Sequence, residues 1–286
     1  MGNAAYQPRT NWRKILSAIA VYLALLVAAA VILLPILWMI STAFKLYRDT
    51  FRIPPMWFPP YFSLDNFKRV FLVIPFGPMM FNSLKVASLG TLGQLISCTL
   101  GGYAVARMRF VGKQPLFLVL LATMMVPYQV VMIPIFIIMK NLGWVNTHTA
   151  LIVPAFLGGA FGIFLMRQFF LTLPNELEDA ARIDGANPLQ IFGYVILPLA
   201  RPALTALAAL SFTSFWNDLL TPLIYLGKME MMTMPVGISF FKGLHSTEWN
   251  LLMAAALLNI IPAAIIFLLT QRQLVSGIAL SGGIKG

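Results

Sequence analysis

Long apolar stretches alternate with short polar segments along this chain. A membrane-spanning helix needs about 20 largely apolar residues. Six stretches meet that need with at most one charged side chain each, whereas a membrane barrel would show short segments of alternating hydrophobicity. The pattern therefore predicts an all-α, polytopic membrane protein with six transmembrane helices. The predicted spans are 15–44, 86–106, 114–139, 141–166, 202–227 and 249–271.

The polar segments complete this organisation. The apolar run of the first stretch exceeds the 7–15 residues of a signal-peptide core, so it predicts a retained helix. The segment 45–77 combines paired prolines with aromatic residues, which predicts an ordered extracytoplasmic loop along the bilayer surface. We expect an N-terminus at 1–14, a transmembrane domain at 15–271, a polar inner loop at 171–200 and a tail at 272–286, with no internal repeat.

Composition agrees with this pattern and excludes other classes. The chain of 286 residues is 59% hydrophobic and only 10% charged, with a mean hydropathy of +0.84. Soluble enzymes, secreted disulfide scaffolds and disordered proteins do not have this composition. The net charge of +11 is not gathered in a dense basic run, so it indicates juxtamembrane Lys and Arg and no nucleic-acid partner. The single cysteine, Cys98, forms no internal disulfide.

Orientation follows from the positive charges. With the N-terminus inside, the inner segments carry eleven Lys and Arg residues and the outer segments carry eight. Positive charge favours the cytoplasmic side, above all in short loops and beside the first helix. The sequence thus predicts that both termini are cytoplasmic, in a plasma membrane.

The inner loop at 171–200 carries clear helix signals. Asn175 followed by Glu178 is a capping-box pattern, and Gly185 stands where a left-handed residue ends a helix. Asn187 and Pro188 are typical of a second helix start, which Pro198 is expected to stop. The prediction is a pair of cytoplasmic helices separated by a sharp turn.

The surfaces of these two helices allow two interpretations. Leu189, Phe192 and Ile196 form an apolar stripe in the second helix, and Ala180 and Ala181 give the first a low-relief surface. Such a surface suits the close approach of another protein. It equally suits a helix pair that packs only on its own bundle.

The same loop carries a family resemblance. Asp179-Ala180-Ala181, then Gly185, then the segment 195–198 (Val-Ile-Leu-Pro), resembles the EAA loop of ABC importer permeases, with Asp179 and Val195 as conservative departures from Glu and Ile. The segments 161–170, 102–107, 216–218, 271–272 and 281–286 resemble those of MalG-like permease subunits of carbohydrate importers. Their order and spacing together extend the resemblance over nearly the whole chain.

The resemblance implies how such a chain works. The EAA loop would form a coupling helix seated in a cleft of a cytoplasmic ATPase subunit, and the glycine-rich tail would also reach the ATPase, the alternative for the tail being plain disorder. The implied coupling residues are Glu178, Asp179, Ala180, Ala181, Asp184, Gly185 and Pro198, and the implied docking residues of the tail are Ser281, Gly282, Gly283 and Lys285.

One acidic residue lies within a predicted span. Asp218 should face protein or water, because an unpaired charge in the bilayer costs about 2.5–3.5 kcal/mol on insertion scales. With Trp216 and Asn217 it could line a sugar-accessible cavity, where carboxylate and amide groups bind hydroxyls and the indole stacks on a sugar ring. The alternative is a hydrogen bond that holds two permease subunits together.

Small residues also mark the second span. Four glycines allow close approach of neighbouring helices, or serve as hinges for alternating access. They are Gly90, Gly93, Gly101 and Gly102.

The sequence shows no catalytic or metal-binding group, since His148 and His245 lie far apart without a Cys or carboxylate cluster. A phosphate-binding P-loop motif is also missing. We expect no cofactor or metal in this chain, and we expect ATP and Mg²⁺ to be bound by partner subunits.

These observations favour one function over two others. The resemblance implies a permease subunit of a bacterial or archaeal ABC importer for a sugar or related solute, which works in lipid with a second permease, two ATPase subunits and an extracytoplasmic binding protein. A secondary transporter should show midplane ionisable groups and a repeat, and a membrane enzyme should show clustered catalytic groups. Disaccharides, oligosaccharides, polyols and glycerol phosphate all remain open as solutes.

Overall fold

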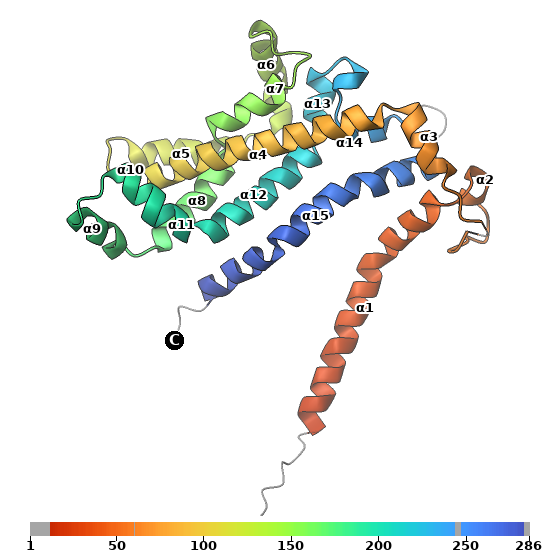
Figure 1. Ribbon diagram of the computed structural model, residues 1–286, viewed down its shortest axis with the longest axis horizontal. Coiled ribbons are helices and arrows are strands. Elements are labelled where there is room, and N and C mark those ends of the chain that lie inside the picture. Colours follow the sequence, from red (N-terminus) through yellow and green to blue (C-terminus); the bar gives the residue numbers. More distant parts are fainter. Residues whose placement is uncertain (1–11, 60, 244–246, 283–286) are drawn as a thin grey trace, which may run out of the picture.

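The computed structural model describes residues 12–59, 61–243 and 247–282, and within these ranges the regular elements are helices. Figure 1 shows an elongated bundle from which α1 stands apart over most of its length. The helices are α1 (Trp12–Ala43), α2 (Tyr47–Thr50), α3 (Asp65–Val73), α4 (Phe76–Arg107), α5 (Lys113–Thr123), α6 (Tyr128–Asn141), α7 (Thr149–Ile152), η1 (Val153–Leu157), α8 (Ala160–Thr172), α9 (Glu176–Ile183), α10 (Pro188–Gln190), η2 (Ile191–Ile196), α11 (Leu197–Leu199), α12 (Arg201–Trp216), α13 (Leu220–Tyr225), η3 (Met229–Met231), α14 (Met234–Ser239) and α15 (Trp249–Gly282).

By length and composition, three helices in the described part of the chain can cross a membrane, or up to six segments if each bent helix pair is one span, which agrees with the predicted all-α polytopic fold. Three are long and apolar enough by themselves, namely Leu16–Ala43, Thr149–Thr172 and Trp249–Gln271. Three more are pairs of helices bent at a short break: α3 with α4 by 76°, α5 with α6 by 102°, and the segment Pro188–Leu199 with α12 by 76°. If each bent pair is one span, half of the six spans are not straight.

The predicted span boundaries were wrong wherever the backbone breaks inside apolar sequence. The stretch 114–139 is not one helix, because Pro127 is extended (ψ 139°) and separates α5 from α6. The next span begins at Thr149 and not at 141, because Gly143 and Asn146 both have positive φ. Hydropathy does not register such breaks, since the residues that cause them are uncharged.

Two further boundaries differ from the prediction. α4 begins at Phe76, ten residues before the predicted start at 86, and it includes Lys85. α12 ends at Trp216 and is followed by the short helix α13, so the predicted span 202–227 is not continuous. Asp218 consequently lies in the turn between α12 and α13.

α4 is the central helix, and its glycines allow its neighbours to come close. A Cβ atom at Gly102 would lie 2.6 Å from the Cβ of Met166 and 3.0 Å from the backbone nitrogen of Arg167, both on α8. A Cβ at Gly90 would lie 2.9 Å from the Phe215 ring of α12. The predicted close helix approach is confirmed at these two positions, because no larger residue fits there without displacement.

α1 contacts the rest of the chain chiefly at its C-terminal end, which is Ala43. The apolar window of α1 is 0% buried. At its end Asn66 of α3 donates to the carbonyl oxygens of Ala43 (2.8 Å) and Lys45 (2.7 Å), and it accepts from Asn250 of α15 (2.7 Å). This buried amide holds α1, α3 and α15 together.

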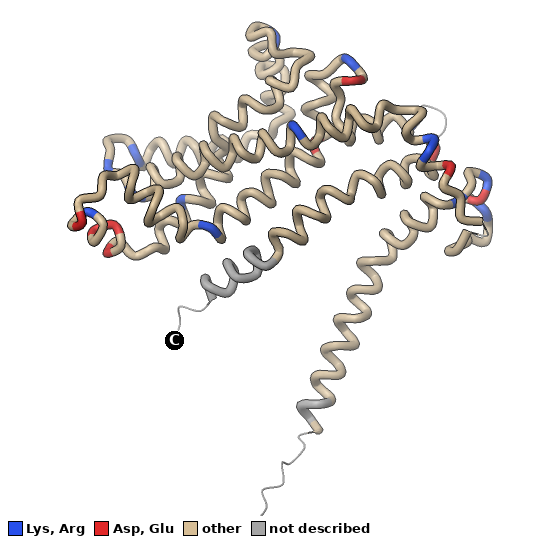
Figure 2. Tube along the Cα trace, in the orientation of Figure 1, with Lys and Arg blue, Asp and Glu red and all other residues tan. Residues whose placement is uncertain are grey.

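Charged residues gather at two ends of the bundle (Figure 2). One group surrounds α9 and α10 and another surrounds α2 and α3, a few further charged residues lie at α6, beside α13 and on α4, and most of the length of the long helices is free of charge. This separation is what a protein with two aqueous faces and an apolar middle requires.

Candidate functional site

The segment between α8 and α12 consists of α9, a turn, and the consecutive pieces α10, η2 and α11. Gly185 has φ +82° in the turn, and the backbone nitrogen of Ala186 donates to the Ala181 carbonyl at 3.0 Å. This is the left-handed end that the sequence predicted. The second helix begins as expected at Asn187, whose side chain accepts from the Gln190 backbone nitrogen while the Gln190 side chain accepts from that of Asn187.

The predicted capping box at the start of α9 was wrong. Asn175 precedes α9 but makes no side-chain capping bond. Its Oδ1 instead accepts from the guanidinium of Arg107 at the end of α4. A charged donor from another helix forms a stronger bond than the backbone amide of the same helix, and only the tertiary fold brings it there.

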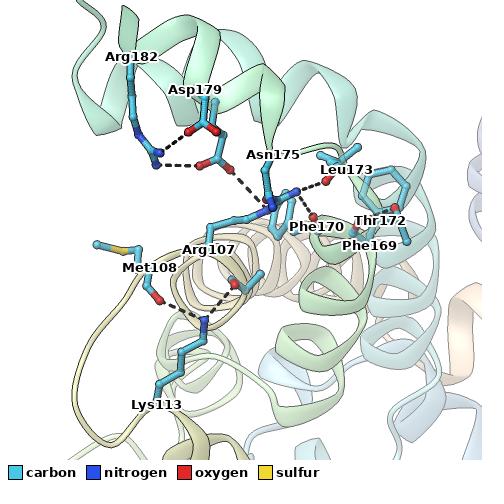
Figure 3. A network of polar contacts seen from close by, with 12 residues as sticks. Arg107, Met108, Lys113, Phe169, Phe170, Thr172, Leu173, Asn175, Asp179 and Arg182 are labelled. Carbon is cyan, nitrogen blue, oxygen red and sulfur yellow. Dashed lines mark hydrogen bonds and ion pairs between the residues drawn. The ribbon is translucent and has the colours of Figure 1, made fainter.

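Arg107 is the centre of a polar network that joins α4 to α9 (Figure 3). Besides Asn175, it donates to the carbonyl oxygens of Phe170 (2.6 Å) and Leu173. Its Nε lies 3.5 Å from Oε1 of Glu178, and the two side chains are only 7% and 5% exposed. Arg182 contacts the other oxygen of Glu178 at 3.3 Å. The start of the inner loop is thus fixed to the end of the central helix by a buried ion pair.

The network divides the implied coupling residues into two faces. Glu178 is buried in the ion pair, and Ala181 packs against the core formed by α4, α8 and η2. Asp179, Ala180, Asp184 and Gly185 are exposed. The low-relief surface expected from Ala180 and Ala181 is therefore presented by Ala180 alone.

Apolar side chains extend this exposed face. The most exposed are Ile183 (87%), Leu189 (79%) and Tyr194 (81%). The expected stripe of Leu189, Phe192 and Ile196 was wrong, because η2 is π-helical and buries Ile191 and Ile196, five positions apart. Leu189 thereby turns outward.

Pro198 does not stop the second helix. It lies in the first turn of α11, where a missing backbone N–H is tolerated, and the helix ends at Leu199 with Ala200 as its C-cap. Ala200 is fully buried at the bend into α12. The proline therefore belongs to the connection between the inner loop and a membrane span.

The residues 216–218 are separated by the fold. Trp216 is 1% exposed, packs against Phe212, and donates from Nε1 to the Asn259 carbonyl at 3.1 Å. The expectation that its indole stacks on a sugar was wrong, because the ring is enclosed. Asn217 is exposed at the end of α12, whereas Asp218 lines a cavity of about 390 Å³ and accepts from the Thr221 backbone nitrogen at 3.1 Å.

The described residues hold no group of three or more His, Cys, Asp or Glu side chains that could bind a metal ion. His148 instead lies 2.8 Å by Nε2 from the Met231 carbonyl and 3.3 Å by Nδ1 from the Lys85 Nζ. His148 is therefore held by contacts within the protein and belongs to no metal site among the described residues. His245 lies outside the described residues.

Comparison with known proteins identifies the chain. Residues 98–279 match the family of binding-protein-dependent transport system inner membrane components, a range that includes the C-terminal end of α4 and the whole inner loop. The chain belongs to this family.

Individual relatives resemble this permease over almost their full length. The arabinooligosaccharides transport system permease protein AraQ of Halalkalibacterium halodurans is 34% identical over 90% of this chain and 93% of the relative. The sn-glycerol-3-phosphate transport system permease protein UgpE of Salmonella typhi is 35% identical over 89% and 93%. A bacterial ABC transporter for import of the acidic polysaccharide alginate has the same fold, with a TM-score of 0.78, 24% identity and coverage of 95% and 100%.

The contacts that Arg107 makes with α9 were not predicted from the sequence. The segment 102–107 was part of the resemblance, but no role was predicted for Arg107. The available signal was its position as the only charged residue in the last three turns of α4, directly before a non-helical connection. The predicted tail is only partly described: Ser281 and Gly282 belong to α15, and Gly283 and Lys285 lie outside the described residues.

Proposed function

We propose that the chain is a permease subunit of an ATP-driven ABC importer that takes up a sugar or related polyhydroxylated solute by alternating access. It works with a second, homologous permease, two ATPase subunits and an extracytoplasmic binding protein. Family membership supports this proposal, as do the relatives named for arabinooligosaccharide and sn-glycerol 3-phosphate transport. ATP and Mg²⁺ are bound by the ATPase subunits, and this chain transmits their motion.

The single observation that carries the coupling role is the two-faced helix α9. Its inner face is locked to α4 through Glu178 and Arg107, and its outer face presents Asp179, Ala180 and Asp184 to water. A rigidly attached helix with a free outer face can transmit the movement of a bound partner to the central span. ATPase closure on ATP would thus move α9 and α4 together, and hydrolysis would reset the inward-facing state.

The orientation follows from the same proposal. The charged end around α9 and α10 faces the cytoplasm, and the end around α2 and α3 faces outward (Figure 2). Both termini are then cytoplasmic, in a bacterial or archaeal plasma membrane. We further propose that the tail residues Ser281, Gly282, Gly283 and Lys285 form a second docking segment for the ATPase.

Isolation of the native assembly tests this proposal. The chain is tagged, extracted gently from its own membranes, and weighed together with whatever remains bound. We expect two ATPase chains and a second six-helix subunit. A stable homo-oligomer without an ATPase would contradict the proposal and support a secondary transporter.

Variants of the turn after α9 and of the buried face of α9 test the coupling role. Gly185→Pro removes the left-handed turn and Ala181→Arg forces a charge between α9 and its core, so both are expected to abolish uptake while membrane insertion persists. The measurements are ATP-dependent uptake in membrane vesicles and the amount of inserted chain. Full uptake by both variants would contradict the coupling assignment.

A further inference from the structure

Two cavities adjoin the central helix and share two of their lining side chains. The first, of about 390 Å³, lies among α4, α6, α7, η1, α12 and α13, and the second, of about 460 Å³, lies among α4, α5, α8 and α12. Gln94 of α4 and Phe215 of α12 line both. These two side chains therefore form the partition between the cavities.

Two glycines leave room for the side chains of Phe215 and Gln94. A Cβ at Gly90 would lie 2.9 Å from the Phe215 ring, and a Cβ at Gly159 would lie 2.9 Å from the amide of Gln94. The Oε1 of Gln94 accepts from Cys98 at 2.9 Å, so its amide nitrogen retains its hydrogen-bonding capacity. The ring and the amide are thus held at defined positions by α4 and its neighbours.

The first cavity offers the groups that bind hydroxyls. Asp218 accepts from Thr221 through Oδ1, and its Oδ2 has no hydrogen-bond partner among the described residues. The phenol oxygens of Tyr128 and Tyr225 lie 3.5 Å apart at the same cavity. A carboxylate, two phenols and the Phe215 ring match the alternating polar edges and apolar faces of a sugar.

Charge restricts what these cavities can accept. Asp218 is the only charged residue among those that line either cavity, and no Lys or Arg lines them. A phosphate or carboxylate group there would meet a like charge without compensation in a weakly screened environment. An uncharged hydroxyl group would instead donate to the Asp218 carboxylate.

We propose that the two cavities form this subunit's part of the solute path, that Gln94 and Phe215 form its internal partition, and that the path selects neutral polyhydroxylated solutes over anionic ones. The inference rests on the proposed function and names its substrate class. The relatives do not decide this point, because one is named for an arabinooligosaccharide and another for sn-glycerol 3-phosphate.

Ligand binding to the intact assembly tests the inference. The native complex is placed in nanodiscs without its binding protein, and saturation-transfer NMR is recorded with lactose and arabinotriose as neutral probes and sn-glycerol 3-phosphate as the anionic probe. The variants are Phe215→Ala and Asp218→Asn. Thr213→Ala, on the exposed side of α12, is the matched control.

Wild-type complex should bind at least one neutral probe more strongly than sn-glycerol 3-phosphate. Loss of ring stacking in Phe215→Ala should weaken the neutral probe about fivefold. Loss of the like charge in Asp218→Asn should strengthen the anionic probe about tenfold. Thr213→Ala should change neither.

Three results would overturn the inference: equal or stronger binding of the anion by wild type, an unchanged preference in Asp218→Asn, or no binding of either neutral probe. Loss of the sister permease from the Asp218→Asn complex, detected by native mass spectrometry, would also overturn it, since Asp218 would then hold the subunit interface. None of these results affects the proposed function, which fails only if no ATPase accompanies the tagged chain.

Discussion

At the scale of single residues, Arg107 and Gly185 have the clearest structural roles. Arg107 forms an ion pair with a buried carboxylate and donates to two backbone carbonyls, and Gly185 supplies a backbone conformation that other residues rarely adopt. Each role depends on one property of one side chain, so each can be tested by substitution with a matched control nearby.

Removal of Arg107 should destabilise the assembly strongly. Arg107→Ala leaves Glu178 buried beside only Arg182, and breaking a buried ion pair in this way costs about 3–5 kcal/mol. Arg182→Ala is the control, because that side chain is 59% exposed and its loss should cost about 1 kcal/mol or less. The measurement is the thermal unfolding of each complex in nanodiscs. Equal effects of the two variants would argue against a special role for the buried pair.

Gly185 should be sensitive to even a small side chain. In Gly185→Ala, a residue with a Cβ must adopt the left-handed φ of +82°, and this conformation costs about 1–2 kcal/mol. Gly193 in η2 also has open space around it but has no positive φ, so Gly193→Ala should be neutral or slightly stabilising. Protease sensitivity of the loop in inside-out vesicles reports both changes. If Gly193→Ala loosened the loop as much as Gly185→Ala, backbone strain would not be the cause.

At the scale of elements, the contact of α4 with α8 depends on the absence of a side chain. Gly102→Val would place atoms within about 3 Å of the Met166 side chain and the Arg167 backbone, and overpacking of this kind costs about 1–3 kcal/mol. The bend between α3 and α4 offers a control, because a Cβ at Gly77 would meet nothing within 4 Å. We expect Gly102→Val to lower the yield of folded complex and Gly77→Ala to leave it unchanged, as measured by fluorescence-detected size exclusion.

At the scale of the whole molecule, Asn66 holds the C-terminal end of α1 to the bundle. In Asn66→Asp the two donated bonds to Ala43 and Lys45 become contacts between oxygen atoms, so a loss of about 2–4 kcal/mol is expected from the unsatisfied carbonyls and the buried charge. The exposed Asn141 provides the control variant Asn141→Asp, which should shift stability by about 0.5 kcal/mol or less. Limited proteolysis between α1 and α2 should detect the release of α1 in the first variant alone.

The sequence by itself determined the features that depend on local chemistry and on solvent. Long stretches with at most one charged side chain are stable only in lipid, and their number and length were sufficient to predict six spans and a helical fold. Gly185, Asn187 and Pro188 determined the turn and the second helix start of the inner loop, because their effects act within a few residues. The resemblance added the coupling role, which remains a prediction at the level of individual residues.

Only the tertiary structure decided which partner each polar group takes and where the spans break. Asn175 and Glu178 fit a local capping box, yet Arg107 binds both because a buried charge must be compensated by whatever cation the fold brings near. Trp216 and Asp218 are two residues apart in sequence, but one is enclosed in the core and the other lines a cavity. Such outcomes depend on the packing of helices distant in sequence, which hydropathy and spacing do not encode.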